Sequence, residues 1–381
     1  MYDKILKNAE VLNAEFQWEK TAIALEGDRI AAIGPELGEA REVLDCSGKR
    51  IVPGFVDLHI HGCAGSDTCD ASREALEKMA AYLITKGVTS FCPTTMTISR
   101  EGILAALKNV QACMERPPKG ATIRGVNMEG PFIAQSRKGA QKSEYVRKPD
   151  WKEFVQLYEE SGEIVRLVAL APECEGAEEF IRQVKDLCAI SAAHTDADYE
   201  TAIRAFDLGV SHVTHLFNAM TGMTHRTPGV VGAVLSRSDV RAEIICDGFH
   251  IHPAVLKIAF EVLGDERAVI ISDSIRATGL PDGVSELGGQ TVYVKDGQAR
   301  LADGTIAGST TNMLQEVRNL ISYGVPAERV FRSASLNPAK EIGCDAEIGS
   351  IAEGKLADLL VLDSNWELET VFSHGKKAYS N

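Results

Sequence analysis

The chain has 381 residues, of which 45% are hydrophobic and 25% are charged, and its formal net charge is −14. This ordinary globular composition excludes a disordered chain, and the length allows one large domain with a smaller one beside it. The acidic balance argues against nucleic acids and membrane surfaces as partners, because both need a basic patch that outweighs the overall charge.

Residues 1–50 contain three short strand-like segments. These segments cover residues 4–12, 21–25 and 29–33. Glu26, Gly27 and Asp28 separate the last two and are suited to a hairpin turn. The chain is therefore predicted to begin with β-structure.

The pattern changes at residue 54 to apolar strand-like runs that alternate with helical segments. Strands are predicted at 54–61, 89–95, 123–130, 165–171, 189–195, 212–218, 242–248 and 268–273. Helices are predicted at 72–86, 100–115, 151–161 and 177–187, and the sixth connection is the shortest. Eight β-α units of this kind favour a closed (β/α)8 TIM barrel. A doubly wound open sheet is the alternative, although no G-x-G-x-x-G or Walker A sequence follows any strand.

The part of the chain after the eighth strand mixes helices with further β-structure. A hairpin is predicted at 290–295 and 298–301, helices at 310–323 and 327–341, and strands at 358–362 and 369–372. We expect β-segments from both ends of the chain to pair with each other. They would form a small discontinuous domain of residues 1–52 and 347–381, beside a barrel of residues 53–346.

Side chains that can bind a metal occur at the ends of the predicted strands. His59 and His61 alternate along a strand, so both project from the same side, as a metal site requires. In barrel enzymes the working residues lie at the carboxyl-terminal strand ends. The residues there are His59, His61, Glu129, His194, His215 and Asp273. Imidazole combined with carboxylate suits zinc or iron-like divalent ions, whereas magnesium and calcium prefer oxygen ligands.

Two of these positions need an individual interpretation. His212 lies three residues before His215, so in a strand the two side chains face opposite sides. We assign His215 to the barrel mouth and a structural role to His212. Asp273 is suited to act as a general base, because a metal lowers the pKa of bound water to about 7 and a carboxylate can accept its proton.

These residues belong to longer segments that resemble the amidohydrolase superfamily and, within it, the family of N-acetylglucosamine-6-phosphate deacetylases. The segments include Pro53-Gly54-Phe55-Val56-Asp57-Leu58-His59-Ile60-His61-Gly62, Glu129-Gly130-Pro131-Phe132, Ala193-His194-Thr195, Thr214-His215-Leu216-Phe217-Asn218-Ala219-Met220, Asp247-Gly248-Phe249-His250 and Ser272-Asp273. The resemblance continues to Ala357-Asp358, so it covers nearly the whole chain. The glutamate at the third strand replaces the carboxylated lysine of dihydroorotase-like relatives and favours the deacetylases.

The resemblance implies a (β/α)8 barrel with a small β-sandwich formed by the N- and C-terminal segments, usually as a homodimer. It implies that Glu129, His194 and His215 bind one divalent metal ion, typically zinc. His59 and His61 match the positions that hold a second ion, so two sites are expected. Iron, manganese and cobalt are alternatives, because such ligands accept several ions.

The resemblance also implies a reaction, in which the acetamido group of N-acetylglucosamine 6-phosphate is hydrolysed to glucosamine 6-phosphate and acetate in amino-sugar catabolism. Asp273 would transfer the proton, and His250 would help to stabilise the oxyanion. Asn218, the backbone of Ala219 and Arg226 would hold the phosphate, since arginine offers a fork of donors that matches phosphate geometry.

One segment departs from the family pattern. Many relatives carry Gly-Ala-His where this chain has Gly139-Ala140-Gln141. Gln141 can donate a hydrogen bond to a phosphate or sugar oxygen but cannot add a positive charge. Ala140 and Gln141 are therefore candidate substrate contacts, and a neutral loop variant is the alternative.

Two other functions stay open. Another hydrolase or a deaminase of the same superfamily, acting on a related N-acyl substrate, would have nearly the same centre. A catalytically inactive protein that works by association would be expected to have lost some of the ligands, all of which this chain retains.

The cysteines and the N-terminus predict the compartment. Nine cysteines without C-x-x-C pairs fit a reducing cytosol better than a disulfide framework or a thiolate zinc site. We see no signal peptide and no run of about 18 apolar residues. We therefore expect a soluble, cytoplasmic protein whose partner is a small phospho-sugar, with no nucleic acid and no membrane.

Overall fold

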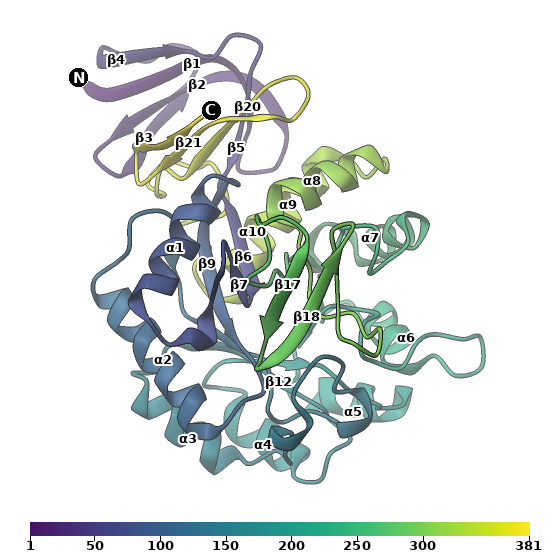
Figure 1. Ribbon diagram of the computed structural model, residues 1–381. Helices are drawn as coiled ribbons and strands as arrows, with labels where there is room; N and C mark the ends of the chain where they lie inside the picture. The colour runs from purple at the N-terminus through teal and green to yellow at the C-terminus, as the bar shows by residue number, and fades with distance from the viewer.

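Eight parallel strands form the centre of the molecule, whose computed structural model describes residues 1–381 (Figure 1). The strands are β6 (Phe55–Ile60), β9 (Val88–Thr95), β11 (Val126–Met128), β12 (Val165–Leu170), β13 (Ala189–Ala192), β14 (His212–Val213), β15 (Arg241–Ile244) and β16 (Ala268–Ile270). Each pairs with the next, and a parallel bridge between Ile60 and Ser274 connects the last to the first. The predicted (β/α)8 barrel is confirmed, and the open-sheet alternative is wrong.

Helices surround this barrel. They are α1 (Arg73–Ile84), α2 (Arg100–Glu115), α3 (Trp151–Glu160), α4 (Ala177–Val184), α5 (Tyr199–Leu208), α6 (Gly229–Ser236), α7 (Pro253–Arg267), α8 (Met313–Ser322), α9 (Ala327–Ala334) and α10 (Leu336–Glu341). Several begin at a capping side chain, such as Ser72 before α1 and Asp150 before α3, which accepts hydrogen bonds from the first turn. None of the helices is long and apolar enough to cross a membrane.

The predicted helix at 327–341 is wrong in one respect, because the chain forms α9 and α10 instead. Pro338 has no N–H, and in a continuous helix its ring would clash with the carbonyl group of Ala334. The backbone breaks between the two helices at Ser335, where φ is −136° and ψ is −69°.

The last four strands of the barrel end earlier in the structure than the sequence predicts. Strands β13, β14, β15 and β16 end at residues 192, 213, 244 and 270. Beyond three of these ends the backbone turns into the left-handed region, with φ of +45° at His194, +32° at His215 and +47° at Asp273. Non-glycine residues rarely adopt this region, and such exceptions concentrate at functional sites. The candidate ligands therefore project from turns rather than from regular strands.

Both ends of the chain build a second sheet. It contains β1 (Tyr2–Leu12), β2 (Trp18–Glu26), β3 (Arg29–Gly34), β4 (Ala40–Asp45), β5 (Arg50–Pro53), β20 (Leu359–Leu362), β21 (Leu368–Ser373) and β22 (Lys376–Ser380). Antiparallel pairing of β20 with β5 joins the two ends, and Figure 1 shows this sheet beside the barrel. We propose that residues 1–52 and 347–381 form a small domain on a barrel of residues 53–346.

Short strands complete the structure in the loops. They are β7 (Gly62–Cys63), β8 (Ser66–Asp67), β10 (Thr122–Ile123), β17 (Gly283–Leu287), β18 (Gln290–Lys295) and β19 (Gln298–Arg300). The predicted hairpin of β18 and β19 gains β17 as a third, antiparallel strand. The sequence pattern does not reveal β17, because most of its side chains are exposed and show no apolar alternation.

Candidate metal centre

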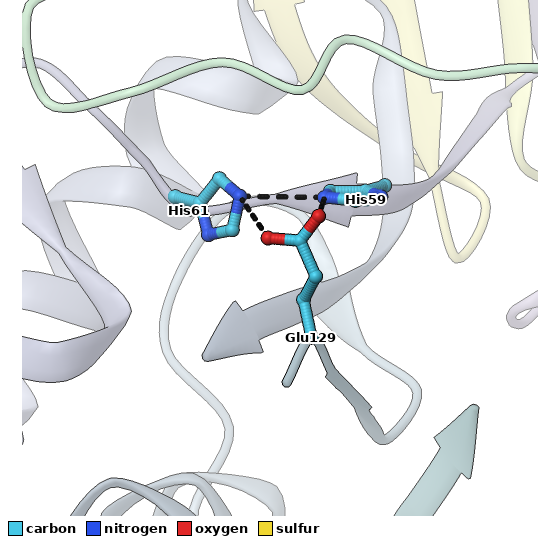
Figure 2. A group of neighbouring side chains, drawn as sticks. All are labelled: His59, His61 and Glu129. Carbon is cyan, nitrogen blue, oxygen red and sulfur yellow. Dashed lines mark hydrogen bonds and ion pairs between the residues drawn. The ribbon is translucent and has the colours of Figure 1, made fainter. Parts of the chain in front are cut away.

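The first half of the centre comes from β6 and the end of β11. His59 and His61 project from the same side, with 3.3 Å between their Nε2 atoms (Figure 2). Glu129 directly follows β11 and places Oε2 at 3.3 Å from His61 Nε2, while Oε1 lies 3.6 Å from His59 Nε2. All three side chains are buried, so the polar atoms face one another rather than solvent.

The second half of the centre contains the same carboxylate and two further histidines. His194 and His215 each place Nε2 at 3.1 Å from Glu129 Oε1, and these two nitrogens lie 3.2 Å apart. Two groups with the spacing of a metal site thus share Glu129, which lies between the two pairs of histidines.

The hydrogen bonds of the histidine rings test whether this centre fits a cation. The Nδ1 atoms of His194 and His215 lie 2.8 Å and 3.1 Å from the carbonyl oxygens of Arg137 and Asn218. A carbonyl oxygen only accepts, so each Nδ1 carries a proton and Nε2 is the ring nitrogen directed at the centre. Each Nε2 faces a carboxylate oxygen, and a cation between an imidazole nitrogen and a carboxylate oxygen stabilises such a contact. The donor set therefore fits a divalent metal ion.

Glu243, on β15, holds the His59 ring from the opposite side. Its Oε2 lies 2.8 Å from His59 Nδ1, and both side chains are buried. Burial lowers the pKa of His59, but the charges of Glu243, Asp273 and Glu129 outweigh this and raise it to about 9. The charges that attract a proton to this ring also attract a cation, so the electrostatics favour a positive ion at the centre.

Asp273 lies beside the pair of histidines from β6. Its Oδ1 is 3.3 Å from His61 Nε2 and 3.5 Å from His59 Nε2, and the side chain is 7% exposed. Burial raises the pKa of Asp273, but the charges of His59 and His61 outweigh it, and the net pKa is lowered. The carboxylate is therefore ionised and able to accept a proton.

A cavity of about 380 Å³ opens onto the centre. Among the predicted site residues it is lined by His61, Glu129, Ala140, Gln141, His194, His215, Asn218, Ala219, His250 and Asp273. His250 places Nδ1 at 2.7 Å from Asp247 Oδ2, so its Nε2 remains free for a ligand. Arg226 is exposed on the loop between β14 and α6, and it does not line the cavity.

Known proteins are similar to this chain over nearly its whole length. The model of the amidohydrolase family matches residues 50–378. This chain belongs to the amidohydrolase family. The N-acetylglucosamine-6-phosphate deacetylase of Bacillus subtilis (strain 168) is 39% identical over 350 residues, which are 91% of this chain and 88% of that protein. The N-acetylgalactosamine-6-phosphate deacetylase of Escherichia coli O157:H7 is 35% identical, with 98% and 99% covered.

A solved structure of another amidohydrolase extends the comparison. A mutant of the N-acetyl-D-glucosamine-6-phosphate deacetylase from Mycobacterium smegmatis, in complex with N-acetyl-D-glucosamine-6-phosphate, matches with a TM-score of 0.93 and 31% identity. The match covers 100% of both chains. The resemblance to the deacetylases of this family is thus confirmed.

Two residues near the centre of this amidohydrolase are not among those that the sequence predicts. Arg137 lines the cavity and donates from Nε to Asp196 Oδ1 at 2.7 Å. Glu243 is a carboxylate inside an otherwise apolar strand segment, Ala242 to Cys246, and this anomaly is the signal that could have revealed it.

Strand alternation does not separate His212 from His215, although the structural role predicted for His212 is consistent with its contacts. Strand β14 ends at Val213, so the rule of opposite faces does not extend to His215. His212 Nε2 lies 3.2 Å from Glu243 Oε1, and its Nδ1 lies 3.3 Å from Glu341 Oε1. The ring therefore helps to hold Glu243, which in turn contacts His59.

Replacing Glu243 by glutamine is expected to weaken metal binding at His59 about 10–100-fold, because groups that orient a ligating imidazole contribute this much to affinity. The amide keeps the shape but loses the charge beside Nδ1. Titration of the metal-free protein with Zn²⁺ measures the effect. Glu316→Gln is the matched control, because Glu316 is an equally buried glutamate that accepts from the backbone N–H of Cys246 and has no contact with His59. Equal weakening in both variants would contradict this role.

Proposed function

We propose that this amidohydrolase hydrolyses the acetamido group of N-acetylglucosamine 6-phosphate, releasing acetate and glucosamine 6-phosphate. The observation that carries the proposal is the presence of Asp273, His250 and the histidine-carboxylate centre around one cavity. The full-length similarity to sugar-phosphate deacetylases supports the substrate. The cavity volume of about 380 Å³ is at the lower end of the range for small-molecule sites, as suits a monosaccharide.

In the proposed reaction, Asp273 accepts a proton from the attacking water and later returns it to the leaving nitrogen. His250 Nε2 is placed to donate to the developing oxyanion, and Asp247, whose Oδ2 lies beside Nδ1, holds the ring in its orientation. A divalent ion held by Glu129, His194 and His215 would supply a Lewis acid and lower the pKa of the water. The carbon–nitrogen bond breaks as the amine takes up the proton.

For the metal, we propose zinc in two sites that share Glu129, with iron, manganese or cobalt as alternatives that the same ligands accept. One site consists of Glu129, His194 and His215, and the other of His59, His61 and Glu129.

We also propose that the protein is a cytoplasmic homodimer. All nine cysteines are free, which fits a reducing compartment.

N-acetylgalactosamine 6-phosphate is a second candidate substrate, because one relative at 35% identity is a deacetylase of that sugar phosphate. The two substrates differ only in the configuration of one hydroxyl group. Comparison of kcat/KM for the two identifies the preferred substrate.

The test of the proposed function is the release of free amine by the zinc-loaded protein. N-acetylglucosamine 6-phosphate, N-acetylgalactosamine 6-phosphate and unphosphorylated N-acetylglucosamine are the substrates. We expect turnover of the first, with acetate and amine formed in equal amounts. The absence of turnover on all three sugars with zinc, iron, manganese and cobalt would overturn the assignment.

Arg226 is predicted to contact the phosphate, and Arg226→Ala tests this. A charge-assisted hydrogen bond is worth about 1.5–3 kcal/mol, so KM for the phospho-sugar should rise about 10–100-fold. KM for the unphosphorylated sugar should not change. Arg137→Ala is the comparison, since Arg137 lines the cavity and Arg226 does not. If only Arg137→Ala raised KM for the phospho-sugar, then Arg137 rather than Arg226 would contact the phosphate.

A further inference from the structure

Gln141 is buried against the metal centre, and both ends of its amide contact the protein. Its Nε2 donates to Glu129 Oε2 at 2.5 Å, and its Oε1 accepts from the backbone N–H of Thr97 at 2.7 Å. The side chain is 1% exposed. Because only an oxygen can accept from the Thr97 N–H, the amide orientation is defined and the NH2 group faces the carboxylate. Gln141 thus contacts a predicted metal ligand.

The two oxygens of Glu129 face different histidines, and Gln141 contacts only one of the oxygens. Oε1 is the atom at 3.1 Å from both His194 and His215. Oε2, which accepts from Gln141, is the atom at 3.3 Å from His61. The terminal torsion of a glutamate is broad, so an unrestrained carboxylate can rotate. The amide of Gln141 therefore restrains Oε2 on the His61 side.

The loop that carries Gln141 also orients the other half of the centre. The carbonyl oxygen of Arg137 accepts from His194 Nδ1, and the N–H of Gln141 closes a turn onto the carbonyl of Lys138. Gln290 supports the same loop by donating to the carbonyl oxygen of Ala140. The loop thus makes one contact toward each half of the centre. The contact from the Gln141 side chain is the one specific for Oε2.

We propose that Gln141 is a positioning residue, which directs Glu129 Oε2 toward His61 and so determines the affinity of the ion site made by His59, His61 and Glu129. The site of Glu129, His194 and His215 uses Oε1, which accepts no hydrogen bond from Gln141, so we expect it to depend less on this contact. The inference rests on the two-site centre of the proposed function. A neutral amide is suited to this role because it restrains the carboxylate without adding a positive charge that would repel the ion.

The test is a titration of metal-free protein with Zn²⁺ against a chromophoric chelator, with bound zinc counted by elemental analysis. Gln141→Leu removes the donor at similar size, and Gln290→Leu is the matched control for a change to the same loop. We expect Gln141→Leu to bind one of its two ions about 10–100-fold more weakly and the other with little change, since hydrogen bonds to a metal-binding side chain have effects of this size. Gln290→Leu should bind both ions as the wild type does.

Gln141→His is a second test variant, because a ring N–H can again donate a hydrogen bond to Glu129 Oε2. This variant should regain affinity at the weakened site relative to Gln141→Leu, which a purely structural role would not produce. Unchanged affinities in Gln141→Leu would overturn the proposal, as would equal weakening of both sites. A wild type that binds only one ion would also overturn it. Amine release by the wild type tests the proposed function separately. Failure of the role proposed for Gln141 can therefore be distinguished from failure of the proposed function.

Discussion

Asp273→Asn is expected to lower kcat for deacetylation about 10²–10⁴-fold, the range that a positioned general acid or base contributes. Asparagine keeps the size of the side chain but cannot accept a proton from water. Since binding of the phospho-sugar does not require this proton transfer, KM should change little. Steady-state release of amine, measured at saturating substrate, gives the ratio of the two kcat values.

The metal content of the Asp273→Asn protein is the necessary control, because the carboxylate lies 3.3 Å from His61 Nε2. We expect the variant to bind zinc in the wild-type amount, so that its low kcat reflects the lost base. A variant with full metal content and wild-type kcat would show that another group accepts the proton. In that case Asp273 would be a structural neighbour of the histidines.

Glu129→Gln is expected to have the largest effect on metal binding, because this carboxylate contacts all four histidines of the centre. Without its charge, both sites lose a ligand, and bound zinc should fall well below the wild-type amount. The loss of the ion removes several kcal/mol of transition-state stabilisation, so kcat should fall by about 10³-fold or more. Elemental analysis after dialysis and the amine-release assay measure the two effects.

Two variants separate this effect from a general loss of structure. Glu316→Gln changes another fully buried glutamate, which accepts from the backbone N–H of Cys246 rather than contacting the centre. It should retain bound zinc. His61→Ala removes a ligand from one site only, so it should lose one of the two ions. If Glu129→Gln and His61→Ala lost zinc equally, Glu129 would not be shared between the sites.

Much of the barrel could be predicted from sequence because its elements carry local signals. The helix predicted at 100–115 matches α2, whose capping residue Ser99 precedes a helical apolar face. The segment from Phe55 to Ile60 is apolar enough to indicate a buried strand, and its period of two places His59 and His61 on one side. The structure confirms that placement, since the two rings meet at Nε2.

Contacts between distant segments could not be predicted in the same way. The sequence predicts Gln141 as a contact to substrate, and only the structure shows that the loop after β11 also places its amide on Glu129. Glu243 shows no local feature that connects it with His59, which precedes it by 184 residues. Both contacts depend on closure of the barrel, which brings β6, β11 and β15 to one interior.

The sequence by itself determined the barrel class, the ligand types and the strand ends at which they occur, because periodicity and residue chemistry are local properties. Only the tertiary structure decided how the ligands meet. His194, His215 and Asp273 lie in left-handed turns, and such turns are stable only where surrounding contacts compensate for their strain. The sharing of Glu129 between two pairs of histidines likewise requires strands from separate parts of the chain to converge around one carboxylate.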